Sequence, residues 1–423
     1  MKKINNETIV NFLKIFITLF YIFLKLMKYD FAIIGSGIIG LTLAFKLKKK
    51  FKSANIIIFE KEPNSTSHGS GRNSGVLHSG IYYEPGSLRA NLCVKGAIEL
   101  KEYIKSEKLW INECGKLLVP NSNTSYSHLN KLYERAKQNN VKIYKLKKEE
   151  IERKEPNINC KYNYGLHVPF TSVANPYEVS QSLIKNIKKK GIDIIYNCKI
   201  LNISDTNLVA KDKNFQANYI FNCAGLFADV VAENSNLKFK YSFLPFKGKY
   251  WKIKNKNFKL KHLVYPIPDT RYPFLGLHSS HNQNGDFYIG PSSTPVFSRD
   301  AYTDFFGDNI KESLNLFYNF SKKIALNENK LRTLAIKEIL LITKFGFYSQ
   351  VKKMFKNINI NDLELSKQKV GIRSQIFDPQ SKNLVNDFVI INQNQTTHVL
   401  NAISPAWSAS FAFADHLIDQ IHL

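Results

Sequence analysis

The sequence predicts an α/β fold, and three features near its start support this. An apolar run at 31–34, typical of a strand, leads directly into the glycine-rich turn 35–40. A segment at 41–49 follows that is apolar on one helical face and basic near its end. A second apolar run, 56–59, then ends in Glu60. This order of strand, glycine turn, helix and acidic strand end is typical of a Rossmann-type unit that binds a dinucleotide.

The glycine-rich turn has a role for each of its glycines. Gly35 permits the tight turn, Gly37 lets the backbone approach a pyrophosphate, and Gly40 lets the helix pack closely on the strand. The N-terminus of that helix offers free N–H groups and a positive dipole to the phosphates. Glu60 can accept hydrogen bonds from ribose hydroxyls, which disfavours NADP but leaves FAD and NAD both open.

The segment that follows favours FAD over NAD. Residues 67–83 are dense in glycine and small polar residues, at a place where an NAD enzyme would continue with a plain βαβ repeat. Such a segment can wrap the inner phosphate and ribityl chain of a long cofactor, although ordinary surface loops share this composition. A later apolar strand, 219–222, runs into Ala224 and Gly225, as though the chain returns to the nucleotide-binding layer.

Composition restricts the class of protein. The chain has 423 residues, which is enough for two domains, and its 44% hydrophobic content is that of a globular protein. The formal charge of +26 comes from lysines spread along the whole chain, and a nucleic-acid footprint would be clustered, so we expect no nucleic-acid partner. The five cysteines show no C-x-x-C spacing, so we expect no disulfide framework, no metal site and a reducing compartment.

Residues 1–28 stand apart from this pattern. The unbroken apolar run 15–24 is shorter than a membrane span of about 20 residues, and no small-x-small cleavage site follows it. We expect an N-terminal extension that the working protein lacks, because a natural start at Met27 lies just before the first strand. A weak membrane-associating segment and a targeting signal remain the alternatives.

Several strings resemble one known family. The segment R-N-S-G-V-L-H-S-G-I-Y-Y at 72–83 is similar to the L-2-hydroxyglutarate dehydrogenase/oxidase family, within the FAD oxidoreductases shaped like D-amino-acid and glycine oxidases. The resemblance continues almost unbroken from Tyr29 onward. Further strings that carry it include C-G-K-L-L-V at 114–119, P-F-K-G-K-Y at 245–250, Y-P-I-P-D-T-R-Y-P-F-L-G-L-H at 265–278, G-I-R-S-Q at 371–375 and V-L-N-A-I-S-P-A at 399–406. The chain departs from the family pattern at Trp407 and at 173–176.

The resemblance implies a Rossmann-type FAD-binding domain, with an inserted α+β substrate domain that contains a mixed or antiparallel sheet. We expect the FAD-binding domain to be discontinuous, with the remaining stretches forming the substrate domain. The expected FAD-binding stretches are 29–95, 160–230 and 370–423, and the expected substrate-domain stretches are 96–159 and 231–369. Residues 309–356 are predicted to be mostly helical. Within them, 337–356 mixes apolar residues with lysines, which indicates either a helix pair packed on the domain or a segment that lies on a membrane surface.

The last helix is expected to begin with Ser404 as N-cap and Pro405 in its first turn. In flavoproteins of this type such a helix points its N-terminus at the flavin, where its dipole stabilises negative charge. The cofactor-binding residues that we expect are Gly35, Ser36, Gly37, Ile38, Ile39, Gly40, Glu60, Lys61, Gly71, Arg72, Asn73, Ser74, Gly75, Ile200, Ala224, Gly225, Ser404, Pro405 and Ala406.

The implied reaction is hydride transfer from a 2-hydroxy acid to the flavin while the hydroxyl proton leaves to a base. Histidine suits such a base, and we place His78 first and His278 second. Arg373 and Arg271 can each clamp a carboxylate of a dicarboxylate substrate. Tyr83 and Tyr265 can donate hydrogen bonds to the substrate, as can Tyr82, although aromatic packing explains tyrosines equally well.

The leading hypothesis is thus oxidation of L-2-hydroxyglutarate to 2-oxoglutarate, with oxygen or a quinone as electron acceptor. A flavin amine oxidase, a glycine/sarcosine-type amino-acid oxidase and a glycerol-3-phosphate-type dehydrogenase are the enzymatic alternatives. A flavoprotein fold that serves only assembly or membrane docking is the non-enzymatic one. We expect a cytoplasmic location, with peripheral contact to the inner membrane left open.

Overall fold

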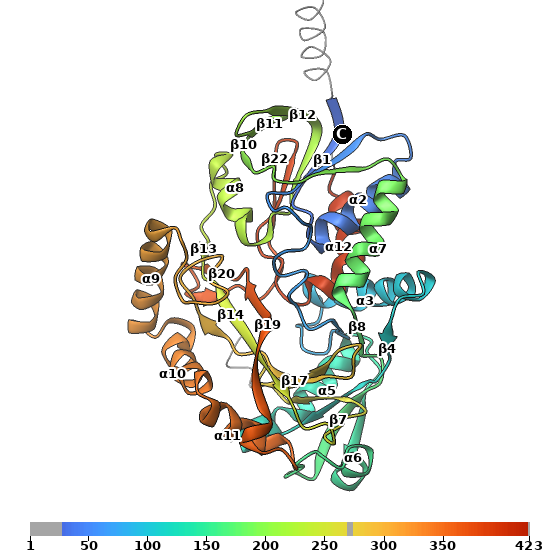
Figure 1. Ribbon diagram of the computed structural model, residues 1–423, viewed down its shortest axis with the longest axis vertical. Coiled ribbons are helices and arrows are strands. Elements are labelled where there is room, and N and C mark those ends of the chain that lie inside the picture. Colours follow the sequence, from blue (N-terminus) through green and yellow to red (C-terminus); the bar gives the residue numbers. More distant parts are fainter. Residues whose placement is uncertain (1–27, 269–273, 422–423) are drawn as a thin grey trace, which may run out of the picture.

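The computed structural model describes residues 28–268 and 274–421. The N-terminal segment 1–27 and Arg271, both singled out in the sequence, lie outside the described residues. The molecule is elongated, with a nucleotide-binding-type layer at the upper end in Figure 1 and further sheets at the lower end.

The upper end is built on an eight-stranded sheet with β1 (Lys28–Ile34) near its centre. β1 pairs in parallel with β2 on one side and with β12 on the other, so its backbone groups are satisfied on both edges. Phe31 and Ile33 face the core cluster of the main helices, and Ala32 and Ile34 face the opposite cluster, as the two-residue period of a strand requires. The other strands are β2 (Ile56–Phe59), β9 (Asp193–Ile195), β10 (Ile200–Ser204), β11 (Asn207–Ala210), β12 (Asn214–Asn222), β22 (Ile390–Gln393) and β23 (Thr396–Val399).

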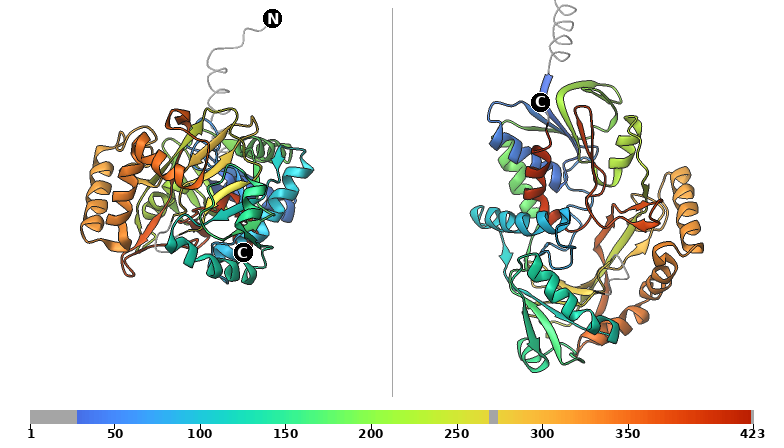
Figure 2. Two further views of the ribbon diagram at one scale, coloured as in Figure 1. Left: turned by 90° about the horizontal axis from the view of Figure 1, so that it is seen from below. Right: turned by 180° about the vertical axis from the view of Figure 1, so that it is seen from behind.

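Helices from distant parts of the sequence cover this sheet. They are α2 (Ile38–Lys50), α3 (Leu88–Ser106), α7 (Pro176–Lys189), α8 (Ala228–Asn234) and α12 (Ala406–Ile418). α12 packs against both α2 and α3, and α2 packs against α7, as Figure 1 and the rear view in Figure 2 show. α12 is buried almost throughout, with its tightest side chains at Ala409, Phe413 and Leu417. Burial of such apolar surface is the main stabilising contribution here.

The lower end contains four smaller sheets. A five-stranded sheet joins β14 (Phe246–Ile253), β16 (His278–His281), β17 (Phe287–Gly290), β18 (Thr294–Pro295) and β19 (Leu363–Arg373). A four-stranded sheet joins β5 (Lys116–Val119), β6 (Tyr144–Lys147), β7 (Tyr164–Val168) and β15 (Leu263–Pro266). Its β5–β15 pair is parallel and its other pairs are antiparallel. The two short sheets join β13 (Ser242–Phe243), β20 (Ile376–Asp378) and β21 (Asn383–Leu384), and β3 (Val76–Leu77), β4 (Ile111–Asn112) and β8 (Ser172–Ala174).

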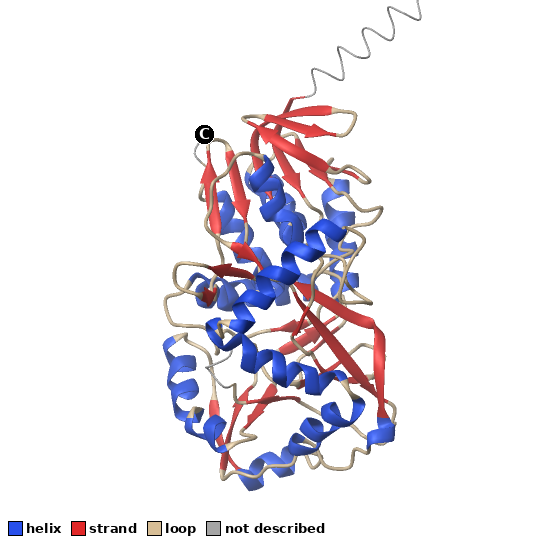
Figure 3. Ribbon diagram, turned by 90° about the vertical axis from the view of Figure 1, so that its left-hand side faces the viewer, coloured by secondary structure: helices blue, strands red, loops and turns tan. Residues whose placement is uncertain are grey.

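The remaining helices lie outside these sheets. They are α4 (Asn123–Ser127), α5 (Leu129–Gln138), α6 (Lys148–Lys154), α9 (Ile310–Ala325), α10 (Leu331–Ile342) and α11 (Lys344–Met354). The last three form an arc along one side of the molecule (Figures 1 and 2), and Figure 3 views the molecule from that side. Thr343 separates α10 from α11 and caps α11, since its hydroxyl accepts a hydrogen bond from Gly346 N. Within 28–268 and 274–421, no helix is long and apolar enough to cross a membrane.

The predicted fold class is confirmed, with parallel α/β layering at one end and mixed sheets at the other. The numerical domain limits stay a prediction. The expected cap of the last helix is wrong, because α12 begins at Ala406 and Pro405 occupies the N-cap position without a side-chain cap. The hydroxyl of Ser404 hydrogen-bonds with Tyr83, and its carbonyl oxygen accepts from Arg89, so Ser404 faces away from the helix amides.

Candidate active site

A cavity of about 1110 Å³ runs between the two ends of the molecule. The turn between β1 and α2, the segment 66–74 and the N-terminus of α12 line it on one side. His278 on β16, Arg373 on β19 and Tyr250 on β14 line it on the other side. The cavity is thus larger than a site for a small acid alone needs, and its length spans both the nucleotide layer and the mixed sheets.

At the nucleotide end, two glycines hold the turn in a shape that no larger residue fits. Gly35 has a φ of +101°, and a Cβ there would lie 2.6 Å from the carbonyl oxygen of Cys223. A Cβ on Gly40 would lie 2.0 Å from the carbonyl oxygen of Gly35. The β1–α2 turn therefore approaches both the neighbouring strand end and its own helix closely, which brings the first turn of α2 to the cavity.

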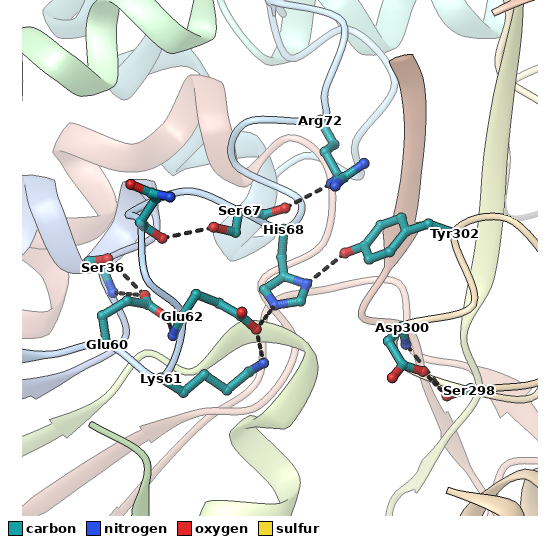
Figure 4. Close-up of polar contacts among 11 residues, drawn as sticks. Ser36, Glu60, Lys61, Glu62, Ser67, His68, Arg72, Ser298, Asp300 and Tyr302 are labelled. Atoms are coloured by element: carbon teal, nitrogen blue, oxygen red, sulfur yellow. Dashed lines mark hydrogen bonds and ion pairs between the residues drawn. The ribbon is translucent and has the colours of Figure 1, made fainter. Parts of the chain in front are cut away.

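Glu60 is held in place beside this turn (Figure 4). Its Oε2 accepts hydrogen bonds from Ser36 N at 2.9 Å and from Ser36 Oγ at 2.7 Å, and its Oε1 accepts one from Glu62 N at 3.0 Å. Glu60 is only 8% exposed, and the exposed part lines the cavity. A carboxylate oriented in this way suits a ribose diol, so the residues present fit the adenosine half of FAD.

His68 links the nucleotide end to the rest of the molecule (Figure 4). Its Nε2 lies 2.9 Å from Glu62 Oε1 and its Nδ1 lies 2.6 Å from the Tyr302 hydroxyl. Burial lowers the pKa of His68, and the Glu62 carboxylate opposes that shift. The Arg72 guanidinium stacks 4.1 Å from the centre of the Tyr302 ring, while its Nε donates to Ser67 O at 2.7 Å. Glu62 and Tyr302, the latter in the loop before α9, thus hold the cavity-lining residues His68 and Arg72 in place.

At the opposite end, His278 has a defined tautomer. Its Nδ1 lies 2.8 Å from the carbonyl oxygen of Gly276, which can only accept, so Nδ1 carries the proton and Nε2 is free to accept one. Burial lowers the pKa of His278 to about 3, and the nearby charges of Lys116 and Arg373 add to this effect. Its ring stacks on Tyr265, with the two ring centres 4.0 Å apart. His278 is therefore neutral at physiological pH.

His78 also lines the cavity, directly after β3. Its backbone N–H donates to Ser408 Oγ on α12 at 2.9 Å, which joins the segment 76–78 to the first turn of that helix. Its Nδ1 is buried and has no hydrogen-bond partner among the described residues. Burial holds the pKa of His78 well below its ordinary value, and Lys116, His278 and Arg89 contribute in the same direction.

Arg373 projects from the end of β19. Its Nη1 donates to Ser292 O at 3.2 Å and to Ser293 Oγ at 3.4 Å, which fixes one arm of the guanidinium. Burial lowers the pKa of Arg373, whereas Tyr250 and Glu338 oppose that shift. Arginine nevertheless stays charged at any physiological pH. Among the described residues no carboxylate is paired directly with it, so its planar fork is available to an acidic ligand.

The structure places most of the predicted site residues on this one cavity. Those that line it are Gly35, Gly37, Ile38, Ile39, Glu60, Lys61, Arg72, Asn73, Ser74, His78, Tyr83, Ile200, Ala224, Gly225, His278, Arg373, Ser404, Pro405 and Ala406. Five others do not line it: Ser36, Gly40, Gly71, Gly75 and Tyr265. Ser36 hydrogen-bonds to Glu60, which does line the cavity. Gly40 allows α2 to pack closely on the β1–α2 turn. Tyr265 stacks on the ring of His278.

Sequence reasoning missed several residues of the wall. Ser70 accepts a hydrogen bond from Ile38 N at 2.9 Å, at the first turn of α2. Tyr250 is buried beside Arg373, and burial raises its pKa to about 12. Tyr250 belongs to the string 245–250 that carried the family resemblance, and Ser70 lies in the segment 67–83 that was expected to wrap the cofactor, so a signal existed for both. Nothing local marked Ser408. Of the two departures from the family pattern, Trp407 lines the cavity and 173–176 does not.

No group of three His, Cys, Asp or Glu side chains in the described part of the chain is arranged to hold a metal ion. The five cysteines, all within the described ranges, are unpaired.

The fold and this cavity define an FAD-dependent oxidoreductase, and a family model described as FAD dependent oxidoreductase matches residues 30–420. An L-2-hydroxyglutarate dehydrogenase of Escherichia coli strain UMN026 is 31% identical over 401 residues, covering 93% of each chain. The human mitochondrial protein of that name is 31% identical and covers 93% of this chain and 89% of its own. This chain belongs to the FAD-dependent oxidoreductases and, within them, to the L-2-hydroxyglutarate dehydrogenase family.

Solved structures of lower identity share the fold. L-alpha-glycerophosphate oxidase from Mycoplasma pneumoniae, solved with FAD bound, superposes with a TM-score of 0.73 at 20% identity, covering 93% of this chain and 94% of its own. Glycine oxidase from Geobacillus kaustophilus superposes with a TM-score of 0.67 at 15% identity and the same coverage. These likenesses show the architecture and leave the choice of substrate to the residues of the site.

Proposed function

We propose that this protein oxidises L-2-hydroxyglutarate to 2-oxoglutarate. The observation that carries the proposal is the combination, at one end of the cavity, of an unpaired guanidinium on Arg373 with two neutral histidines. The names of its relatives at about 30% identity support the same substrate. When bound, FAD supplies the acceptor for the hydride that leaves the substrate Cα.

Arg373 binds one carboxylate of the substrate in this proposal. Its fork geometry matches a carboxylate bidentately, and the contacts with Ser292 and Ser293 hold it in position before the substrate arrives. Glu338 acts electrostatically on Arg373 but forms no ion pair with it, and its Oε2 accepts a hydrogen bond from Ser293 N at 2.6 Å. Two acidic side chains that line the cavity are engaged elsewhere. Asp387 accepts hydrogen bonds from Leu88 N and Arg89 N, and Glu84 pairs with Arg135.

His278 is the base that takes the hydroxyl proton, with His78 as the second candidate. A general base must be unprotonated and correctly oriented, and the Gly276 carbonyl oxygen gives His278 a fixed tautomer with Nε2 as the acceptor. This hydrogen bond is why His278 takes precedence over His78, the order opposite to the one that the sequence suggested. Proton removal by His278 and charge pairing by Arg373 both prepare the Cα–H bond for cleavage.

Turnover with a panel of substrates tests this proposal. The purified chain, loaded with FAD, is given an artificial electron acceptor and, separately, L-2-hydroxyglutarate, D-2-hydroxyglutarate, glycine, sarcosine or glycerol 3-phosphate. We expect acceptor reduction and stoichiometric 2-oxoglutarate with the L acid only. Turnover of an amine or of glycerol phosphate, with none of the L acid, contradicts the proposal and favours one of the other FAD oxidoreductase activities.

We further propose that the arc of α9, α10 and α11 contacts an anionic membrane, where a lipid-soluble quinone rather than oxygen accepts the electrons. The exposed large apolar side chains of the arc and of the loops that adjoin α9 are Phe305, Phe306, Ile310, Leu314, Phe317, Tyr318, Leu326, Ile336, Ile339, Leu340, Ile342 and Phe345. Most of the exposed large apolar residues in the described ranges are among them. Exposed basic residues, such as Lys311, Lys330 and Arg332, lie between them, and this combination suits peripheral binding to acidic lipid.

Vesicle sedimentation tests the membrane contact. The Ile339→Glu/Phe345→Glu double variant should lose binding to vesicles that contain phosphatidylglycerol, because both side chains are more than 60% exposed in the arc. Tyr177→Glu, which changes a 64% exposed apolar residue on α7, is the matched control and should bind as the unchanged protein does. Equal sedimentation of the double variant and the control contradicts the proposed surface.

A further inference from the structure

The helix α10 buries a carboxylate and exposes apolar side chains. Glu338 is only 7% exposed and lies on the same face of the helix as the buried Leu331 and Leu334. The next two residues, Ile339 and Leu340, are exposed. Glutamate is almost never fully buried unless it has a partner, so the contacts of Glu338 indicate what this position does.

Glu338 binds the segment 292–294, which leads into β18. Its Oε2 accepts a hydrogen bond from Ser293 N at 2.6 Å, and the hydroxyl of Thr294 is its second hydrogen-bond partner. The helix that carries Glu338 packs directly against β18. The carboxylate of Glu338 therefore fastens α10 to this short segment of backbone.

The same segment holds the guanidinium of Arg373. Arg373 Nη1 donates to Ser292 O at 3.2 Å and to Ser293 Oγ at 3.4 Å. Ser292 is in turn fixed to β14, because its N–H donates to Lys249 O and its Oγ accepts from Lys249 N, each at 3.1 Å. Ser293 thus contacts Glu338 through its backbone and Arg373 through its side chain.

The place of Glu338, one residue behind Arg373, leaves the guanidinium open. A carboxylate in direct contact with Arg373 would occupy the planar fork that an acidic ligand needs. Glu338 holds the support of the fork instead, and among the described residues only Nη1 of Arg373 is held by hydrogen bonds. The charge of Glu338 also acts on Arg373, which offsets part of the cost of burying a cation.

We propose that Glu338 is a positioning residue, which acts through Ser293 to hold the segment 292–294 where it orients Arg373 toward a substrate carboxylate. The inference deepens the proposed function and rests on it for the role of Arg373. Glu338 does not line the cavity, so it should affect the binding of an acidic ligand through Arg373 and not independently.

A double-mutant cycle tests this coupling. Glu338→Ala removes the acceptor of the Ser293 N–H bond, whereas Glu338→Gln retains an acceptor oxygen at nearly the same place. Each change is made alone and together with Arg373→Met. On the FAD-loaded proteins, kcat and KM are measured with L-2-hydroxyglutarate. The Kd of glutarate, a dicarboxylate that lacks the hydroxyl group, is measured from the change in flavin absorbance and needs no turnover.

We expect Glu338→Ala to raise both KM and the glutarate Kd roughly 10-fold, with little change in kcat. Glu338→Gln should restore most of the affinity. In the Arg373→Met protein, Glu338→Ala should lower kcat/KM no further, because the residue that it positions is already lost.

Glu155→Ala is the matched control for the loss of a buried carboxylate. Glu155 is 1% exposed, and its Oε1 accepts a hydrogen bond from His262 N at 2.6 Å. It neither lines the cavity nor acts on Arg373. Glu155→Ala should leave KM and the glutarate Kd unchanged.

The outcomes distinguish this inference from the proposed function. An unchanged glutarate Kd in Glu338→Ala overturns the inference, as does an equal loss of kcat/KM with and without Arg373. If Glu338→Ala does not fold, Glu338→Asp replaces it, since this carboxylate is one methylene too short to reach Ser293 N, and an unchanged Kd there overturns the inference. Weakened glutarate binding in Glu338→Ala, without turnover of L-2-hydroxyglutarate by the unchanged protein, refutes the substrate and retains the role of Glu338. An unchanged protein that binds neither compound overturns both.

Discussion

The two ends of the cavity satisfy their polar groups in different ways. At the nucleotide end, Glu60, Ser36 and Ser70 make hydrogen bonds to the protein itself, and the turn is fixed by close backbone contacts. At the other end, His78 Nδ1 and Lys116 Nζ are buried without a partner among the described residues. Buried polar groups normally have partners. The comparison teaches that the cofactor end satisfies its polar groups within the protein, whereas the other end holds buried polar groups that the described residues leave without a partner.

The largest effect is expected at the nucleotide end, where shape leaves no tolerance. Gly35→Ala should abolish stable FAD binding, because the new Cβ meets Cys223 O at 2.6 Å and the φ of +101° strains any other residue. The flavin absorbance of the protein after gel filtration measures how much FAD stays bound. Gly285→Ala is the control, since Gly285 also has a positive φ but nothing within 4 Å of its Cβ position. Full flavin content in Gly35→Ala would contradict the claim that the turn at the nucleotide end accepts no larger residue.

At the substrate end, loss of the Arg373 charge should be the most severe change. Arg373→Met should lower kcat/KM for L-2-hydroxyglutarate about 1000-fold, because a buried charge pair contributes several kcal/mol when one partner is removed. Flavin content should stay normal. Steady-state kinetics measures this, with Arg153→Met, which changes an exposed arginine of α6, as the control. An unchanged KM and kcat in Arg373→Met would show that Arg373 does not bind a substrate carboxylate.

The next effect concerns the base. His278→Gln should lower kcat about 100-fold, as expected for loss of a general base, with less change in KM. His281→Gln is the control on the same strand, since His281 is also buried, with its pKa lowered to about 4, and hydrogen-bonds with Asn112. A comparable loss in both variants would indicate a structural effect. Loss in His78→Gln alone would transfer the role to His78.

The smallest effect is on stability and has the opposite sign. Lys116→Met should stabilise the fold by about 1–3 kcal/mol below pH 7, because an unpaired buried charge is costly. The pKa of Lys116 is about 7 in the folded protein against 10.5 ordinarily, so the folded state binds fewer protons between these values. The unchanged protein therefore gains stability as the pH rises through that window, and the difference between the two proteins shrinks. Urea unfolding at pH 6 and pH 9 measures both quantities.

The same contrast explains what the sequence could and could not predict. Gly35, Gly40 and Glu60 lie within one strand–turn–helix–strand unit, so their spacing alone implies their arrangement. The substrate end joins β5, β15, β16 and β19, which come from Lys116 at one extreme of the sequence to Arg373 at the other, and no local pattern specifies such contacts. Lys116 lay in a string that carried the resemblance, yet only its burial shows why it is unusual. The cap at Ser404 failed because Tyr83 and Arg89, distant in sequence, engage that residue.

The most direct test of the account is the visible spectrum of the FAD-loaded protein, recorded anaerobically before and after substrate is added. It joins the two ends of the cavity in one observation, because the cofactor at one end reports on the acid bound at the other. The account predicts flavin bands that bleach with L-2-hydroxyglutarate and persist with the D acid, glycine and glycerol 3-phosphate. Bands that persist with the L acid while another of these compounds bleaches them would contradict it.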